Sequence, residues 1–284
     1  MKQVSMFKTK TKVELSIERI RKFEPEEGYY LGFSGGKDSI CCYHLLKMAG
    51  VKFDGHYNVT GIDHPELVYF IRENYPDIKF EMHKKSIFKL IIENKTPPMR
   101  QSRYCCAELK EGGGEGRFVI NGVRWAESNK RKNSRTVIEN FHKNKKYQIH
   151  TNDNTEGRML LENCIKKGKF ILNPIVDWED EDVWDFIKGN NIKYPDLYDK
   201  GWKRLGCIGC PNHSETARRK DFLRYPKFEQ NYIKAFDKML VERKKAGLET
   251  TWKTGKEVFE WWVLNKSQEK DITFENQIKF EFAK

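Results

Sequence analysis

The sequence predicts an α/β protein built around parallel strands. Over the first 125 residues, four short apolar runs alternate with helix-like stretches, a pattern typical of strands joined by crossover helices. A glycine-rich turn joins the first apolar run to a helix, as in many phosphate-binding α/β proteins. The 284 residues are 38% hydrophobic and 13% aromatic, enough for a packed core in one large or two modest domains.

Each predicted helix or strand follows from a feature of its own residues. Residues 13–23 carry a rough apolar stripe and predict an amphipathic helix. Residues 29–34 form a short apolar run and predict a buried strand. The helix at 37–48 should end at Gly50, and the helix at 65–74 begins with proline in its first turn. The other strands predicted in this half are at 52–60, 78–82 and 118–123.

The second half of the chain predicts mainly helices. An acidic stretch from Glu179 begins one helix, because carboxylates favour the positive end of the helix dipole. Two or three more are predicted in the last 70 residues, at 216–223, 227–246 and 256–265. We therefore divide the chain into an α/β domain over residues 1–212, with an insertion at 129–157, and a helical C-terminal extension over residues 213–284.

The chain is basic, and its charge is concentrated. Its 53 Lys and Arg against 41 Asp and Glu give a net charge of +12, which points to anionic partners. Half of this charge lies in residues 129–146, where seven cations face Glu139 alone: Lys130, Arg131, Lys132, Arg135, Lys143, Lys145 and Lys146. Residues 130–146 could bind nucleic-acid phosphates, with Phe141 and Tyr147 stacking on bases, or could be a solvated loop.

Several classes of protein are disfavoured. No run of 18 apolar residues could span a membrane, and the N-terminal residues lack the apolar segment of an export signal, so we expect a cytoplasmic protein. Seven cysteines are an odd number for a secreted disulfide framework. In a reducing compartment they are metal ligands, catalytic thiols or core residues.

The glycine-rich turn predicts a phosphate site. Main-chain N–H groups at a helix N-terminus can surround phosphates, and bare glycines let the ligand approach. Lys37 would neutralise phosphate charge. Asp38 stands where a Walker A loop needs Ser or Thr, so the turn is a different motif; an ordinary helix-capping turn is the alternative. The candidate residues are Ser34, Gly35, Gly36, Lys37, Asp38 and Ser39.

Four cysteines predict a metal centre. Cys105 and Cys106 are adjacent, and Cys207 and Cys210 form a Cys-x-x-Cys turn about 100 residues later. Four thiolates are the ligand set of a [4Fe–4S] cluster. A zinc ion and a set of redox-active or buried thiols are the alternatives. The remaining cysteines, Cys41, Cys42 and Cys164, are predicted to be core residues.

A second candidate segment follows the strand at 118–123, where ligands bind in open α/β sheets. Arg124 could hold a phosphate or sulfate with two hydrogen bonds, and Glu127 could orient its guanidinium. A structural ion pair is the alternative. Gly122 and Ser128 complete the segment.

Residues 34–39 resemble the pyrophosphatase (PP) loop of the adenine-nucleotide α-hydrolase superfamily. With residues 104–110, 122–128, 173–184 and 197–210, they resemble the phosphoadenylyl-sulfate reductase family, and these segments occur in the family's order. The resemblance implies a five-stranded, mainly parallel sheet with helices on both faces.

The same resemblance implies that the loop and Arg124 bind phosphate or sulfate, that Thr60 and Gly61 lie beside adenosine, and that a cluster lies near the nucleotide. Two departures stand out. Val59 precedes Thr60 and Gly61, where these reductases usually have an acid, and no cysteine follows Cys210 to match their C-terminal nucleophile.

Three functions follow. The first is an iron–sulfur enzyme that binds ATP or an adenylyl sulfate and acts at the α-phosphate or sulfate. Its catalytic residues would be Lys37, Asp38 and Arg124, and Asp38 would hold Mg²⁺ or order the loop. A partner would supply any thiol. The second is an ATP-dependent enzyme that transfers sulfur to nucleic acid. The third is a non-catalytic nucleotide-binding subunit. An oligomer is compatible with each.

Overall fold

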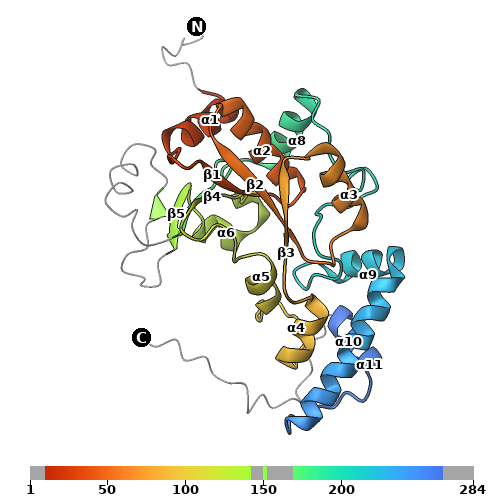
Figure 1. Cartoon of the computed structure of the whole chain (residues 1–284). Coiled ribbons are helices and arrows are strands. Elements are labelled where there is room, and N and C mark those ends of the chain that lie inside the picture. Colours follow the sequence, from red (N-terminus) through yellow and green to blue (C-terminus); the bar gives the residue numbers. More distant parts are fainter. Residues whose placement is uncertain (1–9, 142–149, 152–168, 265–284) are drawn as a thin grey trace. The chain divides into compact units, whose positions relative to one another are not determined.

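The computed structural model describes residues 10–141, 150–151 and 169–264 (Figure 1). The chain forms two compact units, one of residues 1–87 and 104–207, the other of residues 88–103 and 208–284. The predicted division was 1–212 and 213–284; in the structure the second unit begins at residue 208 and also includes residues 88–103. Within that unit the ring of Phe88 packs 5.4 Å from that of Tyr232, and Trp262 donates to the carbonyl of Pro98 at 2.7 Å.

Within the described residues, seven strands form one sheet in the order β3-β2-β1-β4-β7-β5-β6. Their bounds are β1 Tyr29–Gly32, β2 Phe53–Val59, β3 Ile78–Met82, β4 Phe118–Ile120, β5 Ile138–Phe141, β6 His150–Thr151 and β7 Lys169–Leu172. The five strands from β3 to β7 in this order are parallel, which confirms the predicted mainly parallel sheet. The insertion adds β5 and β6, which pair antiparallel at one edge.

Helices flank the sheet in the first unit (Figure 1). They are α1 Lys12–Lys22, α2 Lys37–Ala49, α3 Pro65–Asn74, α5 Tyr104–Leu109, α6 Asn129–Ser134 and α8 Asp180–Gly189. Thr11 caps α1 through a reciprocal capping box with Glu14. Gly50 ends α2 in the left-handed conformation, with φ of 71°, as the sequence predicts.

The two faces of the sheet are packed unequally. Successive strand residues point to opposite faces, so Tyr29 and Leu31 join the main core with α1, α2 and α8. Tyr30 joins only a small cluster with Val119 and Ile171 on the other face. The larger core thus fixes the N-terminal ends of α2 and α8 against the strands, and these ends form the site described below.

The second unit is helical. It contains most of α4 (Ile87–Asn94) together with α9 Glu215–Arg224, α10 Pro226–Lys245 and α11 Gly255–Leu264, and the last three lie where the sequence predicts helices. Aromatic side chains of α9, α10 and α11 pack together around Trp262. None of the helices in the described part of the chain is long and apolar enough to cross a membrane.

Candidate functional site

The predicted phosphate loop lies between β1 and α2. Gly35 has φ of 71°, and a Cβ atom there would lie 2.6 Å from the Ile71 side chain, so glycine is required for both conformation and space. The Ser34 hydroxyl donates to Ser39 Oγ at 3.1 Å, and Ser39 Oγ donates to the Gly36 carbonyl at 2.9 Å. These bonds hold the loop in a closed turn at the N-terminus of α2.

Tyr198 completes the turn from a distant segment. Its hydroxyl accepts a hydrogen bond from the main-chain N–H of Lys37 at 2.9 Å. Burial raises the pKa of Tyr198, so the phenol stays protonated. Tyr198 therefore contacts the backbone group through which a helix N-terminus ordinarily binds an anion.

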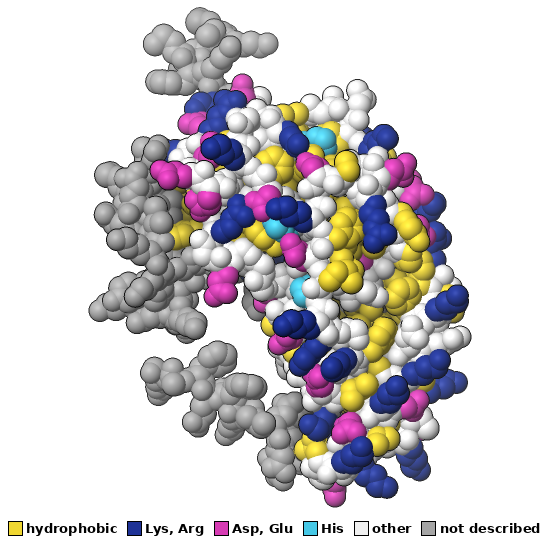
Figure 2. Space-filling model, in the orientation of Figure 1, with side chains coloured by type: hydrophobic (Ala, Val, Ile, Leu, Met, Phe, Trp, Pro, Cys, Tyr) yellow, Lys and Arg dark blue, Asp and Glu magenta, His cyan; other side chains and the backbone are white. Residues whose placement is uncertain are grey.

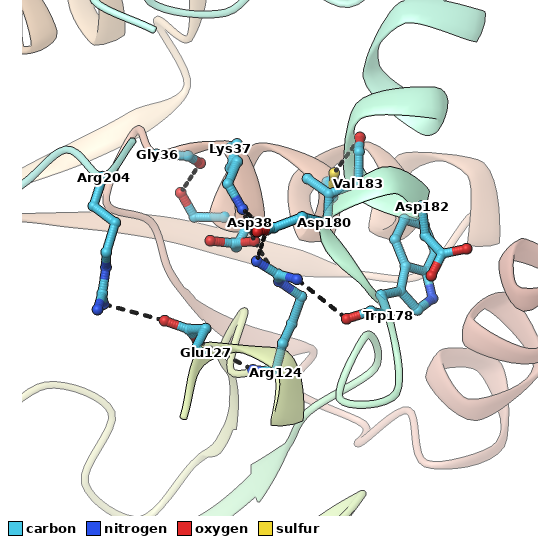
Figure 3. A network of polar contacts seen from close by, with 12 residues as sticks. Gly36, Lys37, Asp38, Arg124, Glu127, Trp178, Asp180, Asp182, Val183 and Arg204 are labelled. Atoms are coloured by element: carbon cyan, nitrogen blue, oxygen red, sulfur yellow. Dashed lines mark hydrogen bonds and ion pairs between the residues drawn. The ribbon is translucent and has the colours of Figure 1, made fainter. Parts of the chain in front are cut away.

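Two buried cations and two carboxylates form the centre of the site (Figure 3). Lys37 Nζ lies 2.8 Å from Asp180 Oδ1 and 3.2 Å from Asp38 Oδ1. Arg124 donates from Nε to Asp38 Oδ1 at 2.6 Å, and from one terminal nitrogen to Asp180 Oδ1 at 2.7 Å. Its other terminal nitrogen donates to the Trp178 carbonyl at 3.1 Å. We call Lys37, Asp38, Arg124 and Asp180 the charged quartet.

Contacts within the charged quartet shift the pKa values of Arg124 and Asp180. Burial acts to lower the pKa of Arg124, but the charge of Asp38 and the hydrogen bond to Asp180 outweigh it and raise that pKa. The hydrogen bond from Lys37, helped by Arg124, lowers the pKa of Asp180. Both shifts favour the charged forms of Arg124 and Asp180, and the formal charges of the two cations and two carboxylates sum to zero.

The structure places Glu127 differently from the expectation. It does not contact the Arg124 guanidinium; it accepts instead from the Arg124 main-chain N–H at 3.2 Å. Its carboxylate also pairs with Arg131 and, at 3.1 Å, with Arg204 (Figure 3). Glu127 thus fixes the backbone after β4, while Asp38 and Asp180 orient the guanidinium.

Gly122 and Ser128 have structural roles in this segment. A Cβ atom at Gly122 would lie 2.8 Å from the main-chain carbonyl carbon of Asp38, so glycine allows the end of β4 to approach the start of α2. Ser128 caps α6, since its hydroxyl accepts from the Arg131 N–H at 3.2 Å. Both residues support the quartet without joining it.

Thr60, predicted as the last residue of a strand, lies with Gly61 in the turn after β2, and a buried acid, Asp63, follows them. Thr60 and Tyr57 donate to Asp63 Oδ2 at 2.8 and 2.6 Å. Asp63 also forms a backbone bridge with Cys207, whose sulfur lies 4.0 Å from Thr60 Oγ1. The buried carboxylate of Asp63 therefore lies three residues after Thr60, whereas Val59, the residue directly before Thr60, is not an acid.

The predicted metal ligands have suitable chemistry but no preassembled centre. All four are partly exposed, and within the described chain none forms a disulfide. Cys105 and Cys106 lie on α5 and, with Cys207, belong to the first unit; Cys210 belongs to the second. Among the described residues, no three His, Cys, Asp or Glu side chains are grouped to hold a metal ion.

Cys41 and Cys42 are core residues, as predicted. Both are fully buried on α2, and burial raises the pKa of each thiol. Cys41 donates to the Val183 carbonyl at 3.8 Å. Cys164 lies outside the described residues.

The basic insertion is partly neutralised where the structure describes it. Arg131 pairs with Glu127, and Arg135 lies 2.6 Å from the buried carboxylate of Glu139. Lys132 is exposed, whereas Lys143, Lys145, Lys146 and Tyr147 lie outside the described residues. On the face drawn in Figure 2, Lys and Arg side chains are interspersed with Asp and Glu. Two of the seven predicted cations thus have structural partners.

The sequence of this chain is similar to those of several known proteins. Residues 28–213 match the model of the phosphoadenosine phosphosulfate reductase domain. An uncharacterized protein from Methanocaldococcus jannaschii is 27% identical over 214 residues, which cover 71% of this chain and 46% of that protein. The chain thus spans about half the length of this relative.

Two reductases are also similar. The phosphoadenosine 5'-phosphosulfate reductase of Salmonella newport is 22% identical over 69% of this chain and 76% of its own length. A crystal structure of phosphoadenylyl-sulfate reductase from Candida auris, a phosphate complex, aligns with a TM-score of 0.45 at 16% identity. That alignment covers 69% of this chain and 90% of the crystallised one.

Proposed function

The chain belongs to the phosphoadenosine phosphosulfate reductase domain family, and from this premise we propose that it binds an adenine nucleotide, either ATP or an adenylyl sulfate. We propose further that it acts at the α-phosphate or at the sulfate joined to it. The observation that supports this most directly is the pair of buried cations, Lys37 and Arg124, beside the glycine turn at the N-terminus of α2.

The chemistry proposed for the site is electrostatic. Phosphoryl and sulfuryl transfer spread negative charge over the peripheral oxygens, and fixed cations and N–H groups stabilise that charge. Lys37 and Arg124 would supply the positive charge. Of the two roles predicted for Asp38, ordering the loop is better supported than holding Mg²⁺, because Asp38 Oδ1 already accepts from both cations.

We also propose that Cys105, Cys106, Cys207 and Cys210 hold a [4Fe–4S] cluster, with zinc as the alternative. The support is chemical: four partly exposed thiols outside disulfides, two of them in a Cys-x-x-Cys turn. A bound cluster would supply charge and redox capacity close to the substrate. Any thiol that reduces sulfate is proposed to come from a partner protein.

Replacing each proposed ligand by serine tests the cluster. We expect chains purified without oxygen to lose most iron and sulfide in Cys105→Ser, Cys106→Ser, Cys207→Ser and Cys210→Ser, because serine is a poor cluster ligand. The matched control is Cys42→Ala, a buried thiol on α2, which should keep full iron content. Zinc without iron in the unchanged chain would favour the alternative, and equal iron in all five variants would exclude this ligand set.

The substrate is tested by product analysis. The chain is incubated in turn with ATP, adenylyl sulfate and phosphoadenylyl sulfate, with and without thioredoxin, and AMP, pyrophosphate and sulfite are measured. We expect nucleotide-dependent release of AMP or pyrophosphate, or sulfite only when thioredoxin is present. Sulfite formed without an added thiol would overturn the proposed partner, and no binding or turnover of any nucleotide would overturn the proposed function.

Sulfur transfer to nucleic acid is the second candidate. It rests on the basic residues 130–146, of which Lys132 is exposed in the structure. Because Arg131 and Arg135 already pair with Glu127 and Glu139, we rank it below the small-molecule function. Salt-dependent retention of DNA or tRNA by the chain, measured in a separate binding assay, would reverse that order.

A further inference from the structure

We propose that Asp180 is an internal anion that occupies the ligand's place on Lys37 and Arg124 and is displaced when a phosphate or sulfate group binds. The proposal rests on the proposed function, since it concerns the same site. It makes Asp180 a determinant of nucleotide affinity, a role that its place in the acidic first turn of α8 does not suggest.

The geometry of one oxygen atom supports this role. Asp180 Oδ1 accepts from Lys37 Nζ at 2.8 Å and from Arg124 at 2.7 Å (Figure 3). A single acceptor thus bridges both cations, which is how a peripheral oxygen of a phosphate would be held between a lysine and an arginine. The carboxylate and the proposed ligand therefore compete for the same donors.

The exposed fractions of the side chains indicate that Asp180 is the member of the charged quartet that a ligand can displace. Its side chain is 70% exposed, whereas those of Lys37 and Arg124 are 7% and 2% exposed. Asp38 is better enclosed, at 25%, and lies in the loop itself. Because Asp180 is the first residue of α8, a change of side-chain rotamer moves its carboxylate into solvent without disturbing the helix.

Displacement of Asp180 changes the net charge that the ligand meets. With Asp180 in place the quartet is neutral, so an incoming anion meets no net positive charge. When Asp180 turns outward, Lys37 and Arg124 face the ligand against Asp38 alone, which leaves a net charge of +1. In the ligand-free chain, the carboxylate of Asp180 holds the two buried cations in position. Because the ligand must displace this carboxylate, its affinity for the site is lower.

Binding measurements on Asp180→Asn test the proposal. Pyrophosphate and ATP are titrated separately into the unchanged chain, the Asp180→Asn variant and a matched Asp185→Asn variant. Asp185 is exposed on the same helix and lies outside the quartet. We expect Asp180→Asn to lower the Kd of both probes about fivefold, the upper end of the effect of removing one exposed competing charge, and Asp185→Asn to change them less than about twofold.

The outcomes are distinguishable. An unchanged or higher Kd in Asp180→Asn, with normal binding by the unchanged chain, would show that Asp180 only positions the cations and would overturn this inference while the proposed function stands. Binding of neither probe to the unchanged chain would instead remove the proposed function. If Asp180→Asn folds poorly in a thermal unfolding assay, Asp180→Ser carries the same test, since serine is well tolerated at a helix N-terminus.

Discussion

Replacing Arg124 by glutamine is expected to lower kcat/KM for the adenine nucleotide by about 10²–10³-fold, the usual cost of losing one fixed donor that stabilises transition-state charge. The guanidinium is almost fully buried and contacts Asp38, Asp180 and the Trp178 carbonyl at once. Glutamine keeps hydrogen-bonding capacity but removes the charge, so Lys37 alone would face two carboxylates and the ligand.

Two further variants make this result specific. Arg124→Lys keeps the charge but not the planar fork, so its kcat/KM should lie between those of the unchanged chain and Arg124→Gln. Arg219→Gln removes an exposed arginine that pairs with Glu215 in the other unit, and should leave kcat/KM unchanged. Steady-state rates are compared at equal folded protein, judged by circular dichroism. A loss below about tenfold in Arg124→Gln would assign the guanidinium a structural role only.

Four of the five parallel strands were predictable because their signals are local, whereas β7 was not predicted from its own residues. Short apolar runs, Gly50 and Pro65 mark β1, α2, β2 and α3 without knowledge of tertiary contacts. The strand β5 was harder to predict, because Glu139 is fully buried within it. Its carboxylate accepts from Arg135 at 2.6 Å and from Asn173 at 2.8 Å, so a charged residue occupies a core position. Arg135 is only four residues away, but Asn173 is 34 residues away in sequence, and its contact with Glu139 follows from no local pattern.

The site was predictable only in part, for a similar reason. The glycine turn and Arg124 stand out from their neighbours, whereas Asp180 is one of several acids that a helix N-terminus explains equally well. Its contact with Lys37 joins residues 143 positions apart, which no spacing rule indicates. Glu127 is predicted to orient the Arg124 guanidinium, but the main-chain N–H of Arg124 and two other arginines are its partners.

Replacing Trp178 by alanine is expected to reduce the free energy of unfolding by about 3–5 kcal/mol, the range for removing a large buried aromatic side chain. The side chain is 1% exposed, and its ring packs 5.4 Å from that of Phe186 on α8. The indole N–H donates to Ser16 Oγ at 3.1 Å, which links this residue to α1. Trp178 thus joins two helices of the main core, and its carbonyl bonds Arg124.

Trp178→Phe separates packing from hydrogen bonding. Phenylalanine keeps most of the ring but not the N–H, so a loss of roughly 1–2 kcal/mol is expected in denaturant unfolding. Both variants retain the main-chain carbonyl that accepts from Arg124, so nucleotide affinity of the folded Phe variant should stay close to that of the unchanged chain. If Trp178→Ala unfolds with the same free energy as Trp178→Phe, the ring does not hold α8 against the sheet, and the position of Asp180 must depend on other contacts of that helix.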